Sequence, residues 1–178
     1  VKGFIEEIEK VTDKPVKLHV NTLGHSDHVW TNHFFPQSRA ICHSLCRKRT
    51  LRIDLKTYES IFLRRFEGAK ITPQDITFEK ELTIFEKREI RLIYNGPAHT
   101  EGDIFVYLPE ESVVFCGDLL FYRCTPLALM GCVSNWIDVL KLLADLDAIY
   151  VPGHGPVTDK KGLLESRDYL IHIQDETR

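Results

Sequence analysis

The feature of this sequence that most constrains its fold is a change in hydrophobic period along the chain. Apolar residues recur at helical spacing in the first dozen residues, over 54–66, in a helix capped by Ser134, and from about 160 to 172. Between residues 76 and 117 the period is two, in the runs "ITFEKELTIF", "EIRLIY", "DIFVYL" and "SVVFCG", which predict a strand meander. Short apolar runs at 16–20 and 148–151 predict further strands, and a short apolar stretch at 40–42 precedes a charged helix. Since helices flank the strands at both ends, we predict a layered α/β or α+β fold.

Size and charge narrow the classes of protein to which the chain can belong. With 178 residues and 43% hydrophobic content, it is long enough for a full core, and we expect residues 1–178 to form a single domain. The net charge is −3 and the charges are interspersed, which argues against binding to nucleic acid or to a membrane surface. A basic cluster at residues 47–49 and 52 is explained by a solvated helix face.

The sequence also indicates where the protein works. It has no apolar run near the roughly 18 residues of a membrane span and no signal-peptide pattern at its start. Its five cysteines lack the spacing of a disulfide framework, which is typical of reduced thiols, so we predict a cytoplasmic protein. Met130 is the only methionine, so the sequence as given does not begin at an initiator and is expected to be a fragment or a processed form.

Ligand-type side chains follow four of the predicted strands. The loop "NTLGHSDHVW" comes after the first strand, "GPAHTEGD" after the strand ending at Tyr94, "CGDLLF" after Phe115 and "PGHGP" after Val151. The carboxyl ends of strands are where layered folds of this kind gather their sites. The candidate metal ligands in these loops are His25, Asp27, His28, His99, Asp118 and His154.

These six residues are of the types that bind zinc and similar ions. Imidazole nitrogen and carboxylate oxygen are favoured ligands, and a catalytic site keeps one position open for water. Asp27 and His28 are adjacent, so they can serve one ion only from a turn, which Asn21, Gly24 and Ser26 predict. Taken singly, a loop histidine is more often a surface residue and a Gly-Asp pair more often a turn. The whole set is harder to explain in that way and suffices for one or two ions.

Other histidines and cysteines fit a metal site less well. Cys42, His43 and Cys46 offer only three ligands with no second pair nearby, so a packed helix start is favoured over structural zinc. The remaining histidines lie in a predicted strand, in predicted helices or in an aromatic stretch, where ligation is not expected; they are His19, His33, His43 and His172.

The four loops, in this order, resemble the motifs of the metallo-β-lactamase superfamily. "NTLGHSDH" is similar to the first motif, H-x-H-x-D-H, while "GPAHTEGD", "CGDLLF" and "PGHGP" are similar to the second, third and last. The resemblance covers nearly the whole chain. It implies an α+β fold, a four-layer αββα sandwich with the metals at one edge.

The resemblance also implies a role for each ligand. His25 and His99 would belong to the first metal site, Asp27, His28 and His154 to the second, and Asp118 would bridge them. In this family a metal-bound hydroxide attacks an ester, lactone, thioester, amide or phosphoester, which agrees with the ability of a metal to lower the pKa of bound water to about 7. Zinc is the metal expected, as one or two ions, with manganese or iron as alternatives.

Two departures from the family pattern carry further expectations. Leu23 occupies the position of the first motif histidine and cannot coordinate, so we expect the first site to be weak or empty and the second to bind metal, with Asp27 orienting the nucleophilic water. Family members usually begin with several strands before the first helix, whereas this chain begins at the helix, which implies an incomplete N-terminal sheet. An exposed sheet edge or apolar face would favour a homo-oligomer.

The leading functional hypothesis is a metal-dependent hydrolase acting on a small-molecule substrate. One alternative is a degenerate, non-catalytic member that acts as a binding or assembly partner, which Leu23 and the short N-terminus favour. A lower-ranked alternative is a mononuclear iron oxidoreductase, because that type is usually built on the first site. The substrate cleft is expected to be lined or covered by Trp30, Phe34, Phe35, Tyr122 and residues 125–131, with ordinary core packing as the alternative.

Overall fold

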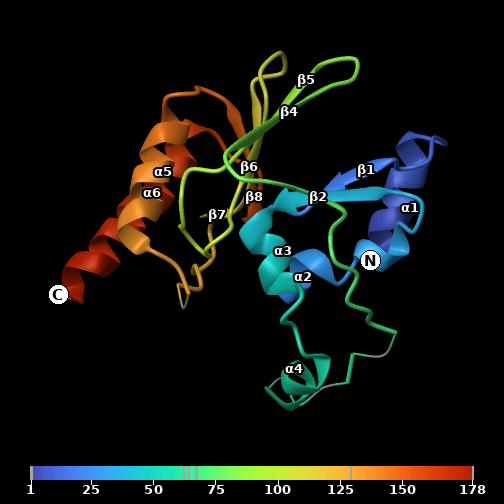
Figure 1. Ribbon diagram of the computed structural model, residues 1–178. Helices are drawn as coiled ribbons and strands as arrows, with labels where there is room; N and C mark the ends of the chain where they lie inside the picture. Colours follow the sequence, from blue (N-terminus) through green and yellow to red (C-terminus); the bar gives the residue numbers. More distant parts are fainter. Residues whose placement is uncertain (1, 62, 64, 67, 129, 178) are drawn as a thin grey trace.

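The fold is a sandwich of two β-sheets with helices on the outer side of each sheet (Figure 1). The computed structural model describes residues 2–61, 63, 65–66, 68–128 and 130–177. The predicted αββα arrangement is confirmed. No helix among the described residues is both long and apolar enough to cross a lipid bilayer.

The smaller sheet consists of three parallel strands. They are β1 (Leu18–Val20), β2 (Arg39–His43) and β3 (Ile76–Phe78), in the order β1-β2-β3. Parallel strands cannot be joined by a tight turn, so each connection contains helices. The helices of this half are α1 (Lys2–Val11), α2 (Ser26–Val29), a 3-10 helix (Asn32–Phe34), α3 (Ser44–Thr50) and α4 (Leu55–Ile61).

The larger sheet has five strands in chain order, antiparallel except for the last pair. They are β4 (Glu81–Phe85), β5 (Glu89–Ile93), β6 (Phe105–Leu108), β7 (Val113–Phe121) and β8 (Ile149–His154). β7 and β8 are parallel, and α5 (Val133–Ala144) forms the crossover between them. α6 (Lys160–Glu176) follows β8 and packs beside α5 (Figure 1).

Two apolar clusters hold these layers together. The larger one joins the big sheet to α5 and α6 and includes the fully buried Trp136 and Tyr150. The smaller one lies between the two sheets, where Ile41 and Phe78 of the small sheet meet Leu92 of the large one. The edge of the large sheet is therefore held by one apolar cluster on each of its two faces.

Three local predictions are wrong. The strand β3 does not join the meander but pairs with β2 in the other sheet, because the run "ITFEKELTIF" bends at Glu79 and Lys80. Cys132, not Ser134, occupies the N-cap of α5. The segment "NTLGHSDHVW", which was predicted to be a loop, contains α2, and the 3-10 helix follows it.

Tyr150→Phe tests the larger cluster. The Tyr150 hydroxyl donates to the Leu143 carbonyl at 2.6 Å, and that carbonyl also accepts from the Leu146 amide. Because the variant loses a buried hydrogen bond without leaving the carbonyl unpaired, we expect the free energy of unfolding to fall by about 1 kcal/mol in urea denaturation. Tyr169→Phe, on the exposed side of α6, should change it by less than about 0.5 kcal/mol. Equal losses in both variants would contradict this account.

Candidate metal centre

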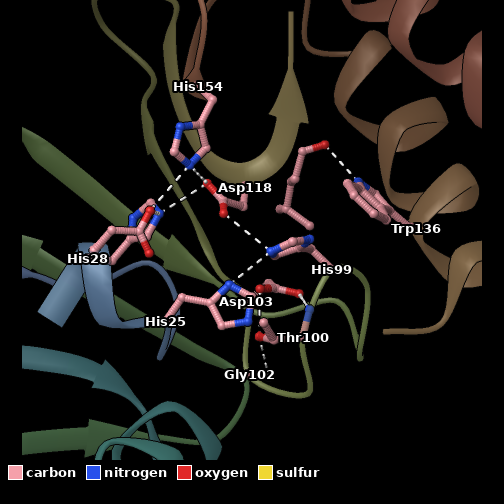
Figure 2. A network of polar contacts seen from close by, with 11 residues as sticks. His25, His28, His99, Thr100, Gly102, Asp103, Asp118, Trp136 and His154 are labelled. Atoms are coloured by element: carbon pink, nitrogen blue, oxygen red, sulfur yellow. Dashed lines mark hydrogen bonds and ion pairs between the residues drawn. The ribbon is translucent and has the colours of Figure 1, made fainter. Parts of the chain in front are cut away.

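The six predicted ligands converge at the edge between the two sheets (Figure 2). They come from the α2 region, from the loop after β5, from β7 and from the end of β8. Their ligand atoms form two sets, each with all atoms within 4.8 Å of one another. The first set is His25, His99 and Asp118, and the second is Asp27, His28 and His154.

The first motif is folded as a short helix start and not as the predicted turn. His25 occupies the N-cap of α2, so Asp27 and His28 lie in its first turn. Asn21 fixes this helix from below, because its Nδ2 donates to the His28 carbonyl at 2.8 Å. Asn21 is itself held by a reciprocal pair of hydrogen bonds with Asn32.

Asp118 reaches the centre from within β7, not from a loop after it as predicted. The register between β7 and β8 shifts on both sides of Gly117, a bulge that redirects the next side chain. Gly117 has a φ of +52°, and a β-carbon there would lie 2.4 Å from Thr22 Oγ1. A glycine is therefore needed both for the backbone conformation and for the close approach to the first motif.

His154 ends β8 directly above Asp118. At the preceding Gly153 a β-carbon would lie 2.0 Å from Asp118 Oδ1, so only glycine lets the two strands approach this closely. The ring of Phe121 stacks on the imidazole of His154 with centroids 5.1 Å apart. Phe121 also contacts His99, which packs edge-to-face on Trp136 at 5.2 Å. These aromatic rings hold two of the ligands from the side of α5.

Asp118 contacts ligands of both sets. Its Oδ2 lies 3.2 Å from His99 Nε2, and its Oδ1 lies 3.2 Å from His28 Nε2 and 3.5 Å from His154 Nε2. In the first set, His99 Nε2 is also 3.1 Å from His25 Nδ1. In the second, Asp27 Oδ2 lies 3.4 Å from both His28 Nε2 and His154 Nε2. The arrangement matches a shared carboxylate between two ligand sets.

The electrostatics of the centre follow from burial and from these contacts. Burial would raise the pKa of Asp118, but the neighbouring imidazoles of His28 and His99 hold it well below its usual range. Burial, together with the charges of His99 and Arg49, lowers the pKa of His25 to about 4. Burial also opposes protonation of His28, but the Asp118 carboxylate outweighs it and raises the pKa of that imidazole. Asp118 is therefore a carboxylate at neutral pH and His25 a neutral imidazole, the forms that bind metals.

The residues present fit a metal ion. Among the described residues, the buried atoms His28 Nε2 and Asp118 Oδ1 have no aligned hydrogen-bond partner, although they face each other. Buried polar atoms of native proteins are normally satisfied, so the pair indicates a missing cationic partner. Neutral imidazole nitrogens and carboxylate oxygens are the donors that zinc, manganese and iron accept.

The remaining candidates lie apart from this cluster. His43, the last residue of β2, donates from Nε2 to the Glu79 carbonyl, accepts from the Leu45 amide and stacks on Tyr94. His19 bonds to Ser38 and His33 to a backbone carbonyl. The predicted helix start at these residues is corrected: Cys42 lies in β2, and only Cys46 lies in α3. Both thiols are buried and lie outside both ligand sets.

The aromatic and support residues of the centre were only partly predicted. Tyr122 lines a cavity of about 340 Å³ beside Phe121, whereas Trp30 is not among the residues that line it and packs on Tyr58 and Phe66. Leu129, within the predicted 125–131 loop, lies outside the described residues. The role of Asn21 was missed, since its sequence position signals only a turn.

Asp103, the last residue of the motif "GPAHTEGD", also supports the centre, although it was not selected from the sequence. Its carboxylate is buried and accepts from both the amide and the hydroxyl of Thr100, next to His99. Burial raises its pKa, and the bonds from Thr100 oppose this rise. Asp103 therefore fixes the loop that carries His99 (Figure 2).

Comparisons with known proteins agree with this geometry. A sequence model of the metallo-beta-lactamase superfamily matches residues 2–154. The 2,4-dinitroanisole O-demethylase subunit alpha of Nocardioides sp. is 29% identical over 148 residues, which are 79% of this chain but only 41% of that protein. A probable metallo-hydrolase of Methanocaldococcus jannaschii is 26% identical over 170 residues, 88% of this chain and 78% of that protein.

A solved structure shows the same fold. The metallo-β-lactamase from Pontibacter korlensis is similar with a TM-score of 0.74 over 95% of this chain and 75% of that one. The two sequences are 19% identical, so this likeness concerns the fold alone.

Asn21→Ala tests whether the support beneath α2 sets the ligand geometry. Outer partners of ligands orient them, so losing the bond to the His28 carbonyl should weaken zinc binding about 10- to 100-fold in a titration against a competing chelator. Tyr150→Phe, which weakens the remote core, should leave zinc affinity unchanged. A similar loss in both variants would show general destabilisation instead of a positioning role.

Proposed function

Because the chain belongs to the metallo-β-lactamase superfamily, we propose that it is a metal-dependent hydrolase centred on Asp118. The observation that supports the proposal most directly is the position of this buried carboxylate, in contact with ligands of both sets. A bound divalent ion would supply Lewis acidity and a water of lowered pKa, chemistry suited to esters, lactones, thioesters, amides and phosphoesters. Zinc is the metal proposed, in one or two copies.

Within this proposal different side chains hold the ion, orient its ligands and accept a proton. Asp27, His28 and His154 would hold the ion of the second site together with the shared Asp118, and the aromatic rings keep the imidazoles oriented. Asp27 is the catalytic residue: its side chain is 56% exposed, so it alone in the second set has a largely open carboxylate that can orient the attacking water and accept its proton.

The first site is proposed to be the weaker one. Leu23 stands at the position of a ligand and is fully buried, so its isobutyl group serves the core and offers no donor. The first set thus consists of two histidines and one carboxylate, a composition also typical of non-haem iron. This observation keeps an iron oxidoreductase as the second candidate function, and the metal's identity distinguishes the two.

Elemental analysis of metal per chain tests the assignment of the sites. The purified protein should hold close to one ion, and Asp118→Ala should lose it because this carboxylate contacts histidines of both sets. Asp138→Ala, an exposed position on α5, is the matched control and should keep the metal. Zinc or manganese would support the hydrolase, whereas iron together with oxygen consumption would support the oxidoreductase.

Leu23→His tests the reduced first site. Restoring an imidazole beside His25 should raise the metal content toward two ions per chain, measured by the same elemental analysis. Unchanged stoichiometry would argue that position 23 does not face the first site.

Asp27→Asn tests the proposed role of this carboxylate. The change preserves size but removes the proton acceptor, so hydrolysis should fall about 10²- to 10⁴-fold. The substrates would be 4-nitrophenyl esters, lactones, thioesters and phosphodiesters, with 2,4-dinitroanisole added because a relative is named for it. Asp138→Asn should not change the rate. A metal-loaded wild-type protein that is inactive on the whole panel would instead favour a non-catalytic binding member.

A further inference from the structure

A cavity that the proposed function does not use opens between α3, α4 and the segment around Met130. Its volume is about 340 Å³. Leu45 and Met130 give it an apolar part, and its charged residues are three cations, Lys48, Arg49 and Arg52, with one carboxylate, Glu101. The cavity therefore combines an excess of positive charge with an apolar wall.

The three cations of this cavity differ from the neighbouring Arg47 in their contacts. Among the described residues, none of the three forms an ion pair, whereas the neighbouring Arg47 is used in the fold by donating from Nε to the Gln74 carbonyl. Arg49 is only partly exposed, and its buried Nε has no hydrogen-bond acceptor. A solvated helix face explains Lys48 and Arg52 but not a buried donor without an acceptor.

The cavity adjoins the first ligand set. Arg49 packs against Gly24, where a β-carbon would lie 3.0 Å from Arg49 Cδ, and the next residue is His25. On the other wall, Glu101 follows His99 by two residues. The segment of Met130 is held against the same loop, because a β-carbon at Gly131 would lie 2.7 Å from the His99 carbonyl oxygen. Figure 1 shows α3 and the segment before α5 at the same end of the molecule.

We propose that this cavity binds an anionic group of the substrate, a carboxylate or phosphate, while the bond to be cleaved lies at the metal centre. This inference rests on the proposed function, since it assigns a substrate class to that site. Cations lining a concave site concentrate anions, and the guanidinium of Arg49 offers the planar pair of donors that such groups accept. Leu45 and Met130 would contact the apolar part of the same substrate.

A pair of esters with the same leaving group tests this substrate class. The metal-loaded protein would be assayed with 4-nitrophenyl acetate, which is neutral, and with 4-nitrophenyl hemisuccinate, which carries a carboxylate. In Lys48→Gln/Arg52→Gln the ratio of kcat/KM for the anionic over the neutral ester should fall about tenfold, since two exposed charges contribute modestly each. The control Lys160→Gln/Lys161→Gln, with the same charge change at the start of α6, should keep the wild-type ratio. An unchanged ratio both in the first variant and in Arg49→Gln, which removes the guanidinium, would overturn the proposal and leave the hydrolase standing.

A binding measurement tests the anion affinity of the cavity independently of catalysis. Phenylacetate and phenyl phosphate would be titrated into the metal-loaded wild type and both double variants by calorimetry. About tenfold weaker binding of either anion to Lys48→Gln/Arg52→Gln alone supports the cavity, and the tighter of the two identifies the preferred group. Equal affinity for all three proteins, or no binding to the wild type, overturns it. If neither ester is cleaved, this titration alone decides the role of the cavity, while the full substrate panel decides the hydrolase proposal.

Discussion

The burial of the Asp118 carboxylate is the constraint on which the centre depends. Only 3% of its surface is exposed, and an isolated charge at such depth would cost several kcal/mol. The protein must therefore bring compensating groups close to it, and imidazoles from three other chain segments do so at 3.2–3.5 Å. That proximity explains why Gly117 and Gly153 are glycines, because a side chain at either position would separate the segments. The shape of β7 and β8 thus follows from the chemistry of one carboxylate.

The layered fold supplies the rigidity that this arrangement requires. The ligands lie where the two sheets meet, with one apolar cluster between the sheets and another beneath α5. Trp136 links the second cluster to the centre: its Nε1 donates to the Leu119 carbonyl at 2.7 Å, one residue from Asp118, while its ring supports His99. A shift of α5 would therefore displace both Asp118 and His99. Stability of the helix layer and geometry of the centre are coupled through this side chain.

The sequence was sufficient to predict which six side chains come together at the centre, but not all of the scaffold that holds them. Periods of two and of 3.6 are local properties, so most helices and strands could be found, and with them the segments that carry the six residues. Local pattern does not encode pairing partners, which is why β3 was placed in the wrong sheet. The bulge at Gly117 depends on Thr22, and the support of Asn21 includes a bond from Gln74. Contacts so distant in the chain leave no periodic signal.

Two features of the first ligand set would both weaken its affinity for a metal ion. Leu23 removes a donor from it, and Arg49 adds a positive charge beside His25, since its side chain packs on Gly24. A fixed cation close to a ligand set opposes the entry of a divalent ion, whereas the same charge attracts an anion. Leu23 in place of a histidine and Arg49 nearby thus favour an asymmetric centre. In such a centre the second set would hold the metal, and the region of the first set would receive the negative charge of the substrate. Leu23 is therefore consistent with a centre in which the two ligand sets have different roles, and its presence alone does not imply that activity is lost.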